Sequence, residues 1–312
     1  MRRTPRLLLA FLLGTGVATV HPAVRLMASS PASHGTAEQT RHSQSPQSPD
    51  AQKATLRNAS ATAPDIPFDY EPQAEQQLLK LANQSRAQAG APPLALDSGL
   101  SEAARAHAQA MLDARQLSHQ LDGELDLSQR IAATSNLQLD QAGENVALDY
   151  DAEHGHEHLM LSPPHRANLL NPAYNVVGLG VVRSGDRLYI VQDFAHALPG
   201  FSTQEVKDHI ALAVNQVRRR TGLPELPRRD LLSADPAACS MAQADKLGTE
   251  QVRKLAEQFT VLTYTSLRPD NLPAGTSHAI SSRNLRSFSV GACYSRTETY
   301  PTGVYWIVLS LE

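Results

Sequence analysis

Apolar residues recur at helical spacing in three segments of the chain. The segment LLKLANQSRAQAG (78–90) places its leucines on one stripe and ends at Gly90, ahead of two prolines, which is typical of an amphipathic helix and its stop. Residues 98–115 are rich in alanine, which favours a helix that packs closely against another layer. A weaker helical pattern covers residues 151–161. We therefore predict three helices in this part of the chain.

Apolar strands follow these helices. Residues 176–182 and 188–194 are apolar runs on either side of Ser184-Gly185-Asp186, which predicts a hairpin of two antiparallel strands. Helices followed by strands that pair through a hairpin indicate an α+β fold, in which helices cover an antiparallel sheet.

The composition of the first 67 residues differs from that of the rest of the chain. Arg2, Arg3 and Arg6 precede the apolar run LLLAFLLGTGVATV, so residues 1–27 are predicted to be a signal peptide that is too short to span a bilayer. Residues 28–67 are rich in Ser, Pro, Gln and Thr and predict a disordered linker. We expect a secreted or periplasmic protein with no membrane span after cleavage.

Length and charge limit the remaining options. The chain has 312 residues, of which 41% are hydrophobic, and this length is typical of about two domains. The formal net charge is -3 and no basic stripe is present, which argues against nucleic acid as a partner.

Short polar motifs lie in a fixed order along the first of these domains. They are NQSR (83–86), LSH (117–119), GEN (143–145), SPPHR (162–166) and YIVQDFA (189–195). Over residues 74–195 this order resembles the CAP superfamily of cysteine-rich secretory, antigen 5 and pathogenesis-related proteins, specifically its bacterial SCP-like branch. The resemblance implies an α-β-α sandwich for residues 68–200. Because Pro163-Pro164 cannot extend a helix, we expect His165 to follow a helix stop, at a helix-to-strand junction.

The resemblance also implies a site. In the family, the residues that match His119, Glu144 and His165 line a cavity, which in some members binds a divalent metal. Two imidazoles and one carboxylate suit an ion such as zinc and leave a position open for water. Ser162 stands where many members have a second glutamate, so the set of four is incomplete. The other reading is a hydrogen-bonded network that only fixes three loops.

Three functions follow from these readings. The first is a non-enzymatic exported protein whose cavity, including Ser162, binds a small molecule, a lipid or an envelope component. The second is a metal-dependent hydrolase acting on peptide or cell-wall material. The third is a structural module that binds a partner. No serine or cysteine nucleophile is identifiable in the motifs, which favours a protein that is not an enzyme.

An internal repeat links the two parts of the chain. Seven residues recur after 132 positions, beginning with Asn83 and Asn215; the first set is Asn83, Gln84, Arg86, Gly90, Pro92, Leu94 and Leu100. The second copy has no Ser-His, Gly-Glu-Asn or Pro-His-Arg triplet, so residues 201–312 are interpreted as a smaller, degenerate CAP-like α+β domain without the site. At this offset Cys239 replaces His107 on the second helix, and Cys293 falls on a strand beneath it. We therefore predict a disulfide between Cys239 and Cys293.

Overall fold

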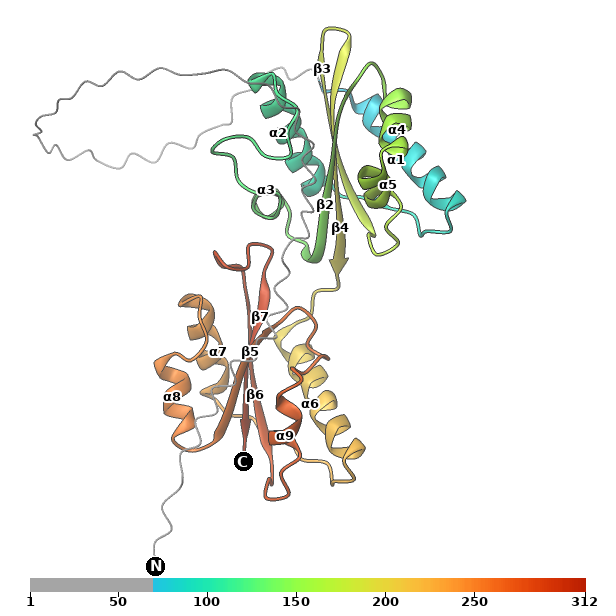
Figure 1. Ribbon diagram of the computed structural model, residues 1–312. Helices are drawn as coiled ribbons and strands as arrows, with labels where there is room; N and C mark the ends of the chain where they lie inside the picture. The colour runs from blue at the N-terminus through green and yellow to red at the C-terminus, as the bar shows by residue number, and fades with distance from the viewer. Residues whose placement is uncertain (1–69) are drawn as a thin grey trace, which may run out of the picture. The chain divides into compact units, whose positions relative to one another are not determined.

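A computed structural model describes residues 70–312 of the protein, so the predicted signal peptide (1–27) and linker (28–67) lie outside the described residues. The folded chain contains two sheets, one on each side of about residue 200, and each is covered by helices on both faces (Figure 1). The α+β class and the α-β-α layering predicted from the sequence are confirmed.

The first sheet has four strands in the order β1-β3-β4-β2. They are β1 (Ala95–Leu96), β2 (Gln138–Asp149), β3 (Val176–Ser184) and β4 (Arg187–Leu198). The β3–β4 and β2–β4 pairs are antiparallel, whereas the two-residue β1 pairs in parallel with β3, so the sheet is mixed and not purely antiparallel as expected. β2 is an edge strand of this sheet.

Two helical layers enclose this sheet (Figure 1). α2 (Ser98–Ala114) and α3 (Leu127–Thr134) cover one face, and α1 (Pro72–Gln88), α4 (Ala152–Leu161) and α5 (Pro163–Leu169) cover the other. Because side chains alternate along a strand, Val181 packs under α1 and α4 while Val182 packs under α2. At Gly180 an added Cβ would lie 2.2 Å from the Ala104 backbone, so this glycine lets α2 lie directly on β3.

Two local expectations were wrong. Pro163 and Pro164 do not leave His165 in a loop, because they occupy the first positions of α5, where a missing amide hydrogen removes no helical bond. The network reading placed Glu144 in one of three loops, but Glu144 lies well inside β2. α3 was not predicted from the sequence, and it begins with Asp126 and Gln129 forming a capping box.

The second sheet has three antiparallel strands in the order β5-β7-β6. They are β5 (Thr260–Ser266), β6 (Phe288–Ser295) and β7 (Val304–Leu311). Its helices are α6 (Thr203–Arg220), α7 (Ala234–Gln243), α8 (Glu250–Ala256) and α9 (Thr276–Ile280). In Figure 1, α7 and α8 lie on one face of this sheet and α6 and α9 on the other.

Residues of the sequence repeat make the same contacts in both halves. Asn83 exchanges two hydrogen bonds with the backbone of Leu94, and Asn215 does the same with Leu226. The buried guanidinium of Arg86 donates from Nε to the carbonyl of Pro92, as that of Arg218 does to Pro224. These contacts support the repeat, while the assignment of residues 201–312 to a degenerate copy stays a prediction.

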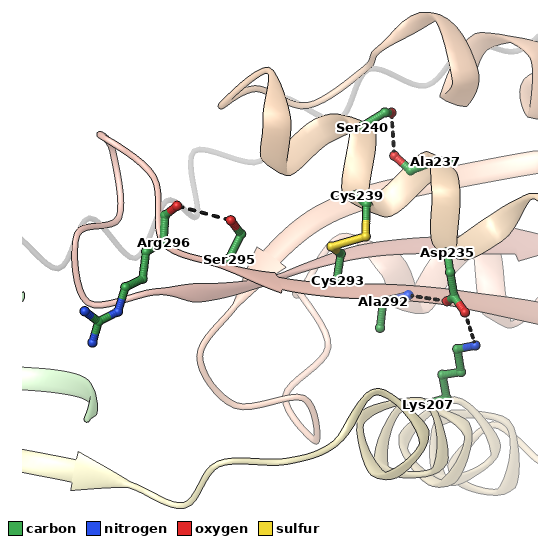
Figure 2. Close-up of a disulfide and its surroundings, with 9 residues drawn as sticks. All are labelled: Lys207, Asp235, Ala237, Cys239, Ser240, Ala292, Cys293, Ser295 and Arg296. Atoms are coloured by element: carbon green, nitrogen blue, oxygen red, sulfur yellow. Dashed lines mark hydrogen bonds and ion pairs between the residues drawn. A yellow bond between two sulfur atoms is a disulfide. The ribbon is translucent and has the colours of Figure 1, made fainter. Parts of the chain in front are cut away.

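The predicted disulfide is confirmed. Cys239 on α7 is bonded to Cys293 on β6, with 5.1 Å between their Cα atoms (Figure 2). The same helix is held to the same strand by Asp235, whose carboxylate accepts a 3.0 Å bond from the Ala292 amide and pairs with Lys207. The disulfide thus ties a helical layer to the sheet of the second half.

No helix within residues 70–312 is long and apolar enough to cross a membrane.

Candidate functional site

His119 lies in the loop between α2 and α3. Its side chain is 40% exposed, and its Nδ1 lies 2.8 Å from Oε1 of Glu144. A carboxylate only accepts, so Nδ1 carries the hydrogen of this bond, and Nε2 is the nitrogen left for a ligand. The loop thus presents one oriented imidazole to solvent.

The triplet Gly143-Glu144-Asn145 lies on the edge strand β2, and each of its residues makes different contacts. Gly143 leaves room for Tyr174, because an added Cβ would lie 2.5 Å from the tyrosine Oη. Glu144 points toward the α2–α3 layer, where it meets His119. Asn145 points to the opposite face, where its Nδ2 donates to the carbonyl oxygen of His165 at 3.1 Å.

His165 lies in the first turn of α5. Nδ1 of His165 lies 2.8 Å from Oγ of Ser162, and Asn168 secures the same turn by donating to the carbonyl of Glu144 at 3.0 Å. The rings of His119 and His165 come from opposite helical layers and meet beside β2, with 6.4 Å between their centroids. The structure therefore brings His119, Glu144, His165 and Ser162 into one group, named here the histidine–glutamate cluster.

Burial lowers the pKa of His165, and the nearby imidazole of His119 lowers it further, because two positive rings repel each other. His165 is therefore neutral at neutral pH. A neutral imidazole bonded to a hydroxyl can exchange a proton or orient a polar group of a ligand.

Behind the histidine–glutamate cluster lies a buried ionic network that no sequence motif revealed. Arg130 on α3 donates to Oε2 of Glu144 at 2.5 Å and to Oε1 of Glu124 at 3.2 Å. His107 on α2 is fully buried; its Nδ1 lies 2.7 Å from Glu124, and its Nε2 lies 2.9 Å from the carbonyl oxygen of Ser118. Both partners of this ring are acceptors, so only a doubly protonated imidazolium satisfies both bonds.

Glu124 is held ionised by this network. Burial alone would raise the pKa of its carboxyl group, but the Leu121 amide, His107 and Arg130 outweigh that effect and leave the pKa lowered. Glu124 and Glu144 thus share the guanidinium of Arg130, and Glu124 is also bonded by His107.

Asp193 adds a third carboxyl group. It lies opposite Glu144 in the β2–β4 register, is fully buried, and receives no hydrogen bond on either oxygen from the described residues. Burial, followed by the charge of Glu144, raises the pKa of Asp193 well above its ordinary value. Burial and the neighbouring carboxylate thus both favour the protonated form of Asp193 over its charged form.

The groups bonded to Glu144 determine whether it can bind the metal ion that the family resemblance implies. Both of its oxygens are already used, one by His119 and one by the permanent cation of Arg130. Among residues 70–312, no three His, Cys, Asp or Glu side chains are grouped so that they could hold a metal ion. As arranged, the residues do not fit a three-ligand metal centre, because a divalent cation at Glu144 would have to displace either the His119 imidazole or the Arg130 guanidinium.

Comparison with known proteins matches one segment of the chain to a known family. The family model of the cysteine-rich secretory protein family, CAP, matches residues 79–194. Protein YkwD of Bacillus subtilis (strain 168) is 32% identical over 136 residues, which are 42% of this chain and 50% of YkwD.

Solved structures give further matches. An extracellular protein containing an SCP domain from Bacillus anthracis is 29% identical, covering 40% of this chain and 41% of that chain, with a TM-score of 0.37. Na-ASP-1 is 8% identical, covering 80% of this chain and 91% of that chain, with a TM-score of 0.44. The chain thus spans half or less of the length of YkwD and of the Bacillus anthracis protein. His119, Glu144 and His165 all fall inside the matched segment, and residues 79–194 form a domain of the CAP family.

Proposed function

We propose that the histidine–glutamate cluster binds the anionic headgroup of a small amphiphile, such as a lipid of the cell envelope, in an exported protein that is not an enzyme. The observation that carries this proposal is the pair of imidazoles, His119 and His165, at 6.4 Å. Each is fixed through Nδ1, and no residue of the described chain bonds either Nε2. One headgroup can therefore hydrogen-bond to both rings.

Electrostatics favours an anion over a neutral headgroup. The pKa of His165 is lowered by burial and then by repulsion from His119. A negative oxygen between the rings would offset this repulsion and stabilise both imidazolium forms, so binding would take up protons. The affinity for an anion should therefore rise as the pH falls toward the titration range of histidine.

Exposed leucines that are close in sequence to residues of the histidine–glutamate cluster support an amphiphile. Leu117 precedes His119 by two residues, Leu125 ends the same loop, and Leu161 adjoins Ser162; all three are exposed. Apolar side chains exposed beside a polar group are typical of sites for lipids and other amphiphiles. The disulfide supports export, because such bonds persist in oxidising compartments.

Binding of cis-parinaric acid, a fluorescent fatty acid, tests the proposal. We expect saturable binding by the full chain that strengthens between about pH 8 and pH 6, and that weakens about tenfold or more in His165→Gln. The matched control is His278→Gln, which removes an exposed histidine of α9 and should bind like the wild type. Lack of binding, or equal binding by wild type and His165→Gln, would contradict the proposal and favour the partner-binding module.

The metal-dependent hydrolase is the second candidate, and pH separates it from the first. Histidines must be neutral to coordinate a metal, so zinc affinity falls as the pH drops. A chelator would abolish metal-dependent activity, but it should leave fatty acid binding unchanged. Zinc uptake that is lost in His165→Gln and weakens in acid would favour the hydrolase reading.

A further inference from the structure

The outer face of α4 carries two histidines that take no part in the histidine–glutamate cluster. His154 and His158 are four residues apart, so they lie one above the other on one face of the helix. Their side chains are 58% and 61% exposed. Both rings are therefore open to solvent on adjacent turns.

Each of these rings is oriented by a carboxylate. Nδ1 of His154 lies 2.8 Å from Oδ2 of Asp151, and Nδ1 of His158 lies 2.6 Å from Oδ2 of Asp149. Nδ1 therefore carries a hydrogen in both rings, and Nε2 is left with a lone pair. A carboxylate on the far nitrogen is the arrangement that fixes the tautomer and raises the basicity of metal-binding histidines.

The carboxylates are themselves held in place. Asp151 caps α4 by accepting a 2.8 Å bond from the His154 amide, and the buried Asp149 accepts a 3.0 Å bond from the Tyr150 amide. Asp149 ends β2 and Asp151 is the N-cap of α4, so the two Nδ1 contacts turn both rings toward the N-terminal end of the helix. The two rings are thus arranged before any ligand arrives.

The third histidine of this run has another role. His156 is buried on the inner face of α4, and its Nε2 lies 2.8 Å from Oγ of Ser85 on α1. It joins two helices and is not available to a ligand. The run of alternating histidines (154, 156 and 158) therefore divides into one structural residue and an exposed pair.

We propose that His154 and His158 form a surface site for one divalent transition metal, in which their Nε2 atoms are the protein ligands and water completes the coordination shell. Imidazole nitrogen favours copper, nickel and zinc over magnesium or calcium, and copper binds most tightly in such a series. With two protein ligands the site exchanges its metal readily and remains open to a third ligand from another molecule. This site is separate from the histidine–glutamate cluster and does not depend on its function.

Copper binding by the full chain, purified without a histidine tag, tests this site at about pH 8, where unperturbed histidine is neutral. We expect an electron paramagnetic resonance signal with two equatorial nitrogens, reduced to one nitrogen in His154→Gln and in His158→Gln. Each of these variants should bind copper about tenfold or more weakly. Asp149→Asn keeps both ligands but weakens the carboxylate behind His158, and should also lower the affinity by about tenfold.

Two controls make the result decisive. His278→Gln removes an exposed histidine outside α4 and should leave the affinity and the signal unchanged. His119→Gln should also leave them unchanged. Equal binding by the wild type and His158→Gln would overturn the α4 site. Loss of copper in His119→Gln, with His158→Gln unaffected, would overturn it too and place the ion at the histidine–glutamate cluster. Fatty acid binding is measured separately, so failure of one proposal is distinguishable from failure of the other.

Discussion

Arg130 donates a 2.5 Å hydrogen bond to Oε2 of Glu144, and both side chains are buried. Since His119 uses the other oxygen, the carboxylate is held between a buried guanidinium and an exposed ring. The exposed half of the site is therefore oriented by a residue that a ligand does not reach.

Replacing Arg130 by Met should destabilise the first half of the protein by about 3–5 kcal/mol, because the buried Glu144 and the partly buried Glu124 would lose their shared cation. Hydrogen exchange of peptides from β2 and β4 measures this as a lower free energy of opening. The control is Lys254→Met, which breaks an exposed pair with Glu250 and should change stability by less than about 1 kcal/mol. Equal protection of β2 in wild type and Arg130→Met would contradict the prediction.

Asp193 should make the stability of the first half depend on pH. Its pKa is raised in the folded state, so the folded protein binds more protons than the unfolded chain between the two pKa values, and stability falls as the pH rises through that window. Asp193→Asn keeps the size and polarity of the side chain but cannot ionise. We expect its stability relative to wild type to increase from about pH 4 upward, by up to about 1.4 kcal/mol per pH unit.

Hydrogen exchange of β4 across this pH range measures the difference between Asp193→Asn and wild type. The comparison is made at each pH, so the intrinsic effect of pH on exchange cancels. A constant difference would mean that Asp193 is already ionised in the folded protein.

The exposed part of the site was predictable from the sequence, but its buried support was not. Ser-His, Gly-Glu-Asn and Pro-Pro-His are distinctive triplets, and their order indicates which side chains meet. Arg130 and Asp193 are single charged residues in an amphipathic helix and an apolar strand, where the usual expectation is a solvated or paired side chain. Only the register between β2 and β4 and the packing of α3 show that both meet Glu144.

The position of His165 was predicted wrongly because Pro163 and Pro164 both follow one helix and begin the next. Pro163 and Pro164 end α4, as the sequence indicates, but the same fixed backbone angle begins α5 at once. A proline pair therefore marks a helix boundary without revealing whether a loop or a new helix follows. The disulfide was predictable because the repeat supplied a position for Cys239 on a helix and for Cys293 on the strand beneath it.

Removal of the disulfide should destabilise the second half by about 2–5 kcal/mol. Cys239→Ala combined with Cys293→Ala opens a loop whose ends are 54 residues apart in the sequence. Trp306, the only tryptophan of the chain, is buried in the core against Cys293, so its fluorescence reports on unfolding of this half in urea. Reductant should shift the wild-type midpoint to that of the double variant and leave the double variant unchanged; no shift in the wild type would contradict a stabilising bond.

The repeat should also appear in the energetics. Asn83→Ala and Asn215→Ala each remove two bonds to the backbone of a leucine, Leu94 or Leu226, that is largely buried. Each leaves a buried amide and carbonyl without these partners, so each should destabilise its own half by about 1–3 kcal/mol. Hydrogen exchange of β3 reports on the first variant, and Trp306 fluorescence on the second.

If the two halves are copies of one scaffold, the two losses should agree within about 1 kcal/mol, because the same bonds are lost in the same packing. A loss confined to one half would mean that the shared asparagine has a structural role in only one of them, and would argue against the interpretation of residues 201–312 as a degenerate copy.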